Sequence, residues 1–189
     1  VFDMPAPLSN RFFHLEVTTG LDEFKNYAIK NEIDDRIISF LNFRPNLLHK
    51  IDRNSPAWPS PRQWVKSHNL LSAKLDIDPA VGTAAAAEFR SFCKIYKTLP
   101  NIEKILNGTA SPDFPEDLSA KYALCCALSL RSKDKKQIKN SLTYLAEKAT
   151  SEWLNQCTID LYSILKEKRK GHELVEILQS NERLLAASK

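Results

Sequence analysis

At 189 residues, the chain is long enough for one sizeable hydrophobic core or two small ones. Its 43% hydrophobic and 26% charged residues are ordinary for a water-soluble domain, and only four glycines favour helices over a loop-rich or all-β design. The net charge of +4 suits contact with anions such as nucleotides, but it is too mild to require nucleic acid.

The cysteines and histidines predict an intracellular protein without a metal site. All four cysteines lie in apolar runs and lack CxxC spacing, so we expect reduced, buried packing residues (Cys93, Cys125, Cys126 and Cys157). The histidines are scattered rather than spaced as ligands. No apolar run approaches the roughly 20 residues that span a bilayer, and no signal peptide is visible. We therefore expect a cytoplasmic protein that does not contact the membrane.

The first 19 residues combine a proline-rich turn with one predicted strand. The chain opens at Val1 rather than at methionine, which suggests a piece of a longer protein. Residues 14–18 alternate apolar and polar side chains and end with β-branched residues, as strands do. Because a lone strand is unstable in water, we expect it to pair with a sheet outside this chain or to be disordered.

Helical periodicity begins at Leu21 and continues to the end of the chain. It predicts helices over Leu21–Asn31, from Asp34 or Asp35 to Phe43, from Pro61 with apolar positions through Leu75, over Ala80–Leu99, and at Asn101–Leu106. Residues 109–117, with two prolines, form a linker. Beyond it we expect a buried helix at Leu118–Leu130 and amphipathic helices at Ile138–Ala149, Trp153–Ile164 and Leu174–Leu178, with a break at Gly171. The fold class is therefore mainly α, a bundle-like or orthogonal packing preceded by one orphan strand.

The stretch Trp58–Trp64 is a proline-punctuated loop that leads directly into a helix. Ser60 fits the N-cap, and Pro61 fits the first helical position, where its missing N–H costs nothing. Arg62 then lies at the positive end of the helix dipole, where a cation is disfavoured. An arginine there makes sense if an anion binds, and phosphate is the usual one. The alternative is an ordinary surface arginine after a capped turn.

Arg11 is the second arginine placed for anion contact. It lies between Ser9-Asn10 and the apolar pair Phe12-Phe13, at the entry to the predicted strand, where the phenylalanines can anchor the backbone. A guanidinium held out from an anchored turn suits contact with a phosphoryl group across an interface, as an arginine finger does. A surface arginine is again the alternative.

Together, the two arginines resemble the second half of an AAA+ ATPase module of the MoxR-like branch. The segment Leu8-Ser9-Asn10-Arg11-Phe12 resembles the arginine-finger segment of that family, and Pro59-Ser60-Pro61-Arg62-Gln63-Trp64 resembles its sensor-2 segment. The runs 38–45 and 84–92 are similar to its helical lid. The likeness covers the first half of the chain well and continues more weakly to residues 122–124.

The resemblance implies a division of the chain and a set of partners. Residues 1–19 would end the nucleotide-binding α/β subdomain, 20–108 would form the helical lid, and 109–189 a C-terminal helical extension. Arg11 would reach the nucleotide of a neighbouring subunit in a ring. Arg62, with Ser60 and Pro61, would contact the phosphates of ATP held with Mg²⁺ in the same subunit. ATP hydrolysis in the intact protein would then remodel a client protein.

The chain also departs from that family. It contains no GxxxxGK[ST] loop and no apolar strand ending in paired acidic residues, so we do not expect this segment alone to hydrolyse ATP or to bind it tightly. The alternative is a self-contained helical protein-interaction module without nucleotide chemistry. Nucleic-acid binding is disfavoured because the basic runs 133–139 and 166–170 lack interleaved aromatic residues.

Overall fold

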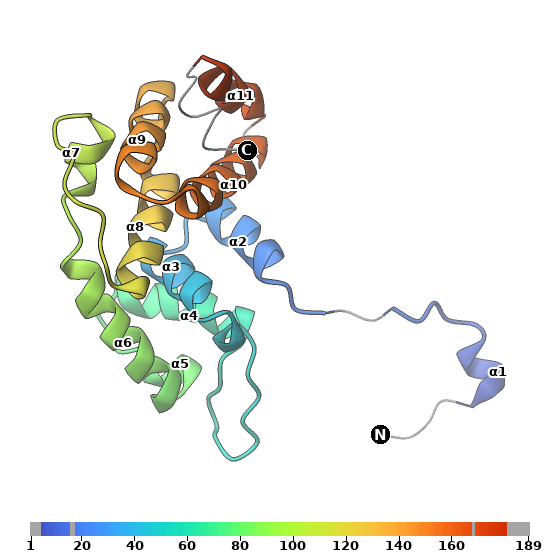
Figure 1. Cartoon of the computed structure of the whole chain (residues 1–189). Coiled ribbons are helices and arrows are strands. Elements are labelled where there is room, and N and C mark those ends of the chain that lie inside the picture. Colours follow the sequence, from blue (N-terminus) through green and yellow to red (C-terminus); the bar gives the residue numbers. More distant parts are fainter. Residues whose placement is uncertain (1–4, 16–17, 168, 181–189) are drawn as a thin grey trace.

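The computed structural model describes residues 5–15, 18–167 and 169–180, and these residues form eleven α-helices, one short 3-10 helix and no strand. In chain order the elements are α1 (Ala6–Ser9), α2 (Leu21–Lys30), α3 (Asp35–Phe43), η1 (Pro45–Leu47), α4 (Pro61–Ser72), α5 (Asp78–Val81), α6 (Thr83–Lys97), α7 (Ile102–Leu106), α8 (Leu118–Arg131), α9 (Lys135–Lys148), α10 (Ser151–Glu167) and α11 (Gly171–Gln179). Helices α2 to α11 pack into one body (Figure 1). The predicted mainly α class is confirmed.

The predicted strand at 14–18 is not seen in the described part of the chain. His14, Leu15 and Thr18 have no regular secondary structure, and Glu16 and Val17 lie outside the described residues. No other strand is described with which this segment could pair. Instead, residues 5–15 form an arm with the single turn α1, drawn away from the helical body in Figure 1.

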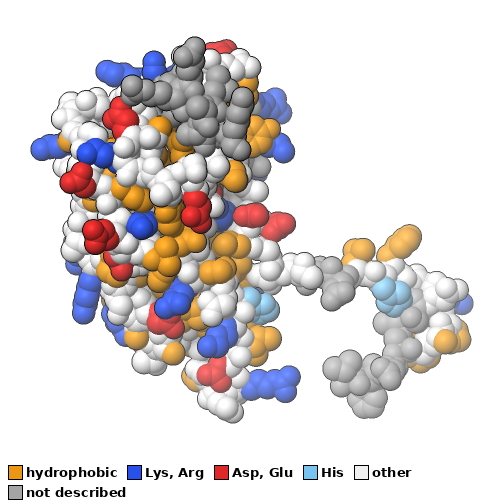
Figure 2. Space-filling model, in the orientation of Figure 1, with side chains coloured by type: hydrophobic (Ala, Val, Ile, Leu, Met, Phe, Trp, Pro, Cys, Tyr) orange, Lys and Arg blue, Asp and Glu red, His pale blue; other side chains and the backbone are white. Residues whose placement is uncertain are grey.

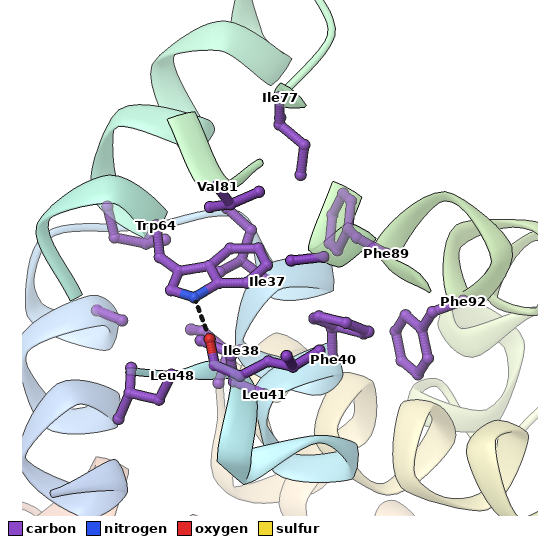
Figure 3. Packing of buried hydrophobic residues seen from close by; sticks show 14 of the residues in the cluster. Ile37, Ile38, Phe40, Leu41, Leu48, Trp64, Ile77, Val81, Phe89 and Phe92 are labelled. Atoms are coloured by element: carbon purple, nitrogen blue, oxygen red, sulfur yellow. Dashed lines mark hydrogen bonds between the residues drawn. The ribbon is translucent and has the colours of Figure 1, made fainter. Parts of the chain in front are cut away.

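A first hydrophobic cluster packs α2 to α6 around Trp64. The Trp64 side chain is fully buried, and its Nε1 donates a 2.8 Å hydrogen bond to the Leu47 carbonyl (Figure 3). Its ring and those of Phe89 and Phe92 surround Phe40 at centroid separations of 5.4 to 5.6 Å, which suits tilted and edge-to-face aromatic contacts. The tryptophan therefore fixes the first turns of α4 against η1.

A second cluster packs α7 to α11, and α8 belongs to both. Ala123 and Cys126 of α8 lie in the first cluster, whereas Leu124 and Leu128 lie in the second. A helix buried on all sides cannot be amphipathic, which explains the nearly continuous apolar run that predicted it. The two clusters thus form two halves of the body that share one central helix, and the linker 109–117 lies within the second half, between α7 and α8.

Two polar contacts also connect α2 and α3 to helices that follow them much later in the chain. Lys25 of α2 and Asp160 of α10 form an ion pair at 2.6 Å. Arg131 of α8 donates to Asp35 of α3 through Nε at 2.8 Å and Nη2 at 2.6 Å, and the Tyr96 hydroxyl donates to the same carboxylate at 2.8 Å. Burial, with the Asp35 carboxylate beside it, raises the pKa of Tyr96, so this hydroxyl remains a donor.

Three predicted helix boundaries are wrong. The helix expected over Ala80–Leu99 is broken at Gly82, which has a φ of +81° and separates α5 from α6. Helix α4 ends at Ser72 because Lys74 adopts a φ of +59°, and Leu75 lies exposed beyond it. The break expected at Gly171 comes before that residue, which instead begins α11.

Candidate functional site

The start of α4 has the capped geometry that its sequence predicts. The Ser60 backbone is extended, and its hydroxyl accepts a 3.4 Å hydrogen bond from the Gln63 amide. Pro61 occupies the first helical position, and the Trp64 amide donates to the Ser60 carbonyl at 3.0 Å. These contacts leave the amide of Arg62 as the open backbone donor of the first turn.

Arg62 is exposed on this turn, and among the described residues no carboxylate forms an ion pair with it. Four other arginines of the helical body form ion pairs: Arg36 with Asp34, Arg44 with Glu88, Arg90 with Asp76 and Asp78, and Arg131 with Asp35. Within the described residues, the Arg62 guanidinium has no hydrogen bond or ion pair. A cation left unpaired at the positive end of a helix is available to an anion.

A groove of about 580 Å³ lies between α2 and the start of α4, with Arg62 on its wall. Pro61 and Val65 line the α4 side, and Phe24 and Tyr27 line the α2 side. The Tyr27 side chain is half exposed, so the groove presents an aromatic surface facing two cations. It therefore combines an apolar floor with few charged groups, as small-molecule sites do.

The second cation is Lys66, which sequence reasoning did not select. Lys66 is exposed, lies one helical turn after Arg62, and lines the same groove. Glu23 also lines the groove, but its side chain folds back over Gly20, the N-cap of α2. Its Oε2 lies 1.7 Å from the position that a Cβ atom on Gly20 would occupy. A carboxylate is favoured there by the α2 dipole, and Glu23 forms no ion pair with Arg62 among the described residues. The i, i+4 spacing of Arg62 and Lys66, which puts both on one face of the helix, could have identified Lys66 from the sequence.

Arg11 lies on the arm and not in the groove. It is exposed just after α1, and the adjacent Phe12 and Phe13 have 57% and 98% of their surface exposed. The phenylalanines therefore do not anchor the Arg11 turn within this chain. Arg11 follows α1 on the arm and does not line the groove, whereas Arg62 lies in the first turn of α4 in the helical body (Figure 1).

The cysteines are packing residues rather than a second reactive site. Cys125, Cys126 and Cys157 are buried free thiols, and burial raises the pKa of Cys126 and Cys157 to about 12, so these sulfurs are poor nucleophiles. Cys93 is only half buried. In the described ranges, no three potential ligand side chains gather as a metal site would need, and no helix has the length and apolarity to cross a membrane.

Charges of both signs are interspersed over the face shown in Figure 2, without the broad basic surface that nucleic-acid binding uses. No family model, curated protein or solved structure matches the chain.

Proposed function

We propose that the chain is the C-terminal portion of a MoxR-like AAA+ ATPase. In this proposal residues 1–19 end the α/β subdomain, 20–108 form the lid, and 109–189 extend it. The groove between α2 and α4 faces the phosphates of ATP and Mg²⁺ that the rest of the intact protein holds. The neighbouring subunit of a ring receives Arg11, and a client protein is remodelled as the lid moves.

The observation that carries the proposal is the unpaired guanidinium of Arg62 on a groove wall. Every part of the α4 start orients it: the Ser60 cap, the fixed φ of Pro61 and the buried ring of Trp64 two residues on. The fixed backbone of this turn sets where the Arg62 side chain begins, and a charge-assisted hydrogen bond from its guanidinium to a phosphate contributes about 1.5–3 kcal/mol. The open Arg62 amide and the Lys66 ammonium add donors in the same groove.

The experiment is ATP turnover by the full-length protein carrying Arg62→Ala. We expect the charge-assisted bond to be lost and kcat/KM to fall by about tenfold to a hundredfold. The matched control is Arg53→Ala, which removes an exposed arginine from the loop before α4 without touching the groove. Turnover that is equal in the two variants would contradict the role of Arg62.

A different result is expected for Arg11, because the nucleotide that it is proposed to contact is bound by a neighbouring subunit. We expect Arg11→Ala to lower kcat by about a thousandfold, as loss of an arginine finger does, while ATP binding stays unchanged. Mixing this variant with a subunit that cannot hydrolyse ATP but retains its own Arg11 should restore part of the turnover. No restoration would argue against action across an interface.

The second candidate is a helical interaction module that binds a protein partner without nucleotide. It is favoured by the arm, where Leu8, Phe12, Phe13 and Leu15 have half or more of their surface exposed. This candidate predicts that Phe13→Ser weakens partner binding and that Arg62→Ala changes nothing. The paired phenotypes of these two variants therefore separate the two functions.

A further inference from the structure

Helix α2 forms a wall of two separate cavities. Phe24 and Tyr27 face the groove that contains Arg62. On the other side of the same helix, Lys25, Asn26 and Ile29 line a second cavity of about 320 Å³, which α8 and α10 complete. A displacement of α2 therefore changes both cavities at once.

The second cavity contains a buried ion pair between the two halves of the body. The side chains of Lys25 and Asp160 are only 13% and 8% exposed, and their 2.6 Å contact joins residues 135 positions apart. Gln156 donates a further 3.4 Å hydrogen bond to the same Asp160 oxygen. Separating two charges that are largely removed from water is costly, so α2 and α10 move together rather than apart.

Helix α2 is otherwise lightly held. Phe24 and Ala28 are its only buried side chains, Leu21 and Ile29 are partly buried, and its N-cap, Gly20, provides no side-chain hydrogen bond. The side of α2 that faces the groove is also open to solvent, since Tyr27 is half exposed there. An element with few buried contacts shifts at low free-energy cost, unlike α8, which is buried on every side.

We infer that α2 couples the Arg62 groove to the C-terminal helices, with the Lys25–Asp160 pair as the connection. An anion that draws Arg62 and Lys66 towards the α2 wall shifts this helix, and the ion pair passes the shift to α10. The inference rests on the proposed phosphate-reading function, because it needs an anion in the groove. It adds the route by which occupancy changes the C-terminal half.

The test is amide hydrogen exchange of the 189-residue chain with and without millimolar tripolyphosphate. We expect exchange to slow at 18–30 and 61–66, where the groove lies, and by about fivefold or more in α10, the range of ordinary allosteric coupling. The double variant Lys25→Met/Asp160→Leu removes the connection without leaving a buried unpaired charge. It should retain the groove response and lose the α10 response.

Two further variants make the result decisive. The swap Lys25→Asp/Asp160→Lys restores an ion pair and should restore the α10 response. The variant Lys135→Gln/Glu176→Gln removes an exposed pair between α9 and α11 and should leave both responses as in the unmodified chain. A groove response without an α10 response in the unmodified chain overturns the coupling and leaves the proposed function standing. An α10 response that survives the double variant also overturns it, and no groove response overturns both.

Discussion

At the scale of single residues, Trp64 anchors the start of α4, the turn that carries Arg62. Its ring fills the first cluster, and its Nε1 satisfies a carbonyl of the short helix η1, so one side chain serves packing and hydrogen bonding together. Trp58, at the other end of the stretch Trp58–Trp64, is only half buried and lies against the His49 ring at a centroid separation of 5.7 Å.

Trp64→Phe should destabilise the chain strongly. The substitution leaves the Leu47 carbonyl without its donor, which costs about 1–3 kcal/mol, and the smaller ring adds a packing loss. Urea denaturation would measure the free energy of unfolding. Trp58→Phe is the control, and it should cost less than about 1 kcal/mol. Equal losses in the two variants would contradict the anchoring role of Trp64.

The buried thiols make stability depend on alkaline pH. Burial raises the pKa of Cys126 and Cys157 from an ordinary value near 9 to about 12 in the folded chain. Above pH 9 the unfolded chain releases protons that the folded chain keeps, so the free energy of unfolding falls as pH rises. Each thiol should lower the free energy of unfolding by on the order of 1 kcal/mol per pH unit once the pH exceeds 9.

Urea unfolding at pH 8, 9 and 10 in reducing buffer would measure this slope. A Cys126→Ala/Cys157→Ala variant starts from lower stability because it loses packing, but its stability should decline less steeply with pH. Identical slopes in the two proteins would show that other groups control the alkaline loss.

At the scale of elements, Gly82 shows what sequence patterns miss. The run 80–99 has the composition of one helix apart from Gly82. The positive φ of Gly82 breaks the run, and a side chain there would begin 2.6 Å from the Ala57 carbonyl oxygen, so the loop before α4 requires a glycine. Local patterns thus predicted the cap at Ser60 and a helix start at Asp34 or Asp35, of which Asp34 is the cap, but not this tertiary constraint.

Gly82→Ala should destabilise the chain by about 2 kcal/mol or more, because both the positive φ and the carbonyl contact oppose a side chain. Gly171→Ala is the matched control. Its nearest contact is Tyr162 at 3.6 Å, and the alanine should stabilise α11 by up to about 1 kcal/mol. Thermal unfolding of both variants measures the two effects. A tolerated Gly82→Ala would mean that the loop and α6 can separate freely.

The candidate site was predictable in its local parts only. The Ser-Pro-Arg spacing placed Ser60, Pro61 and Arg62 correctly on a capped helix start, because capping depends on neighbouring residues. The groove itself depends on α2, about 40 residues upstream, and the Lys25–Asp160 pair spans 135 positions. No periodicity or motif within one segment carries information about contacts of that separation.

At the scale of the whole molecule, α8 makes the two clusters one cooperative unit. Leu41 of α3 and Leu142 of α9 are both fully buried, one in each cluster, and both clusters use α8 as a wall. We therefore expect the slowest amides of α3 and α9 to exchange with opening free energies that agree within about 1 kcal/mol. Native-state hydrogen exchange measures both in one experiment.

Leu128→Ala sharpens this expectation. The residue lies in the second cluster, and its truncation should cost about 2–5 kcal/mol. If the clusters unfold together, protection in α3 falls by the same amount as protection in α9. Leu118→Ala, at an exposed position of the same helix, should change neither. A loss confined to α9 would show that the halves unfold separately.

The position of α8 in the chain has a consequence for biosynthesis. Residues 21–97 supply almost all of the first cluster, but Ala123 and Cys126 close it, and these leave the ribosome later. During elongation the emerging chain therefore exposes the apolar side of α3 and α6 until α8 arrives. A nascent chain stalled before residue 118 should bind a holdase chaperone, and one extended past residue 131 by the length of the exit tunnel should release it.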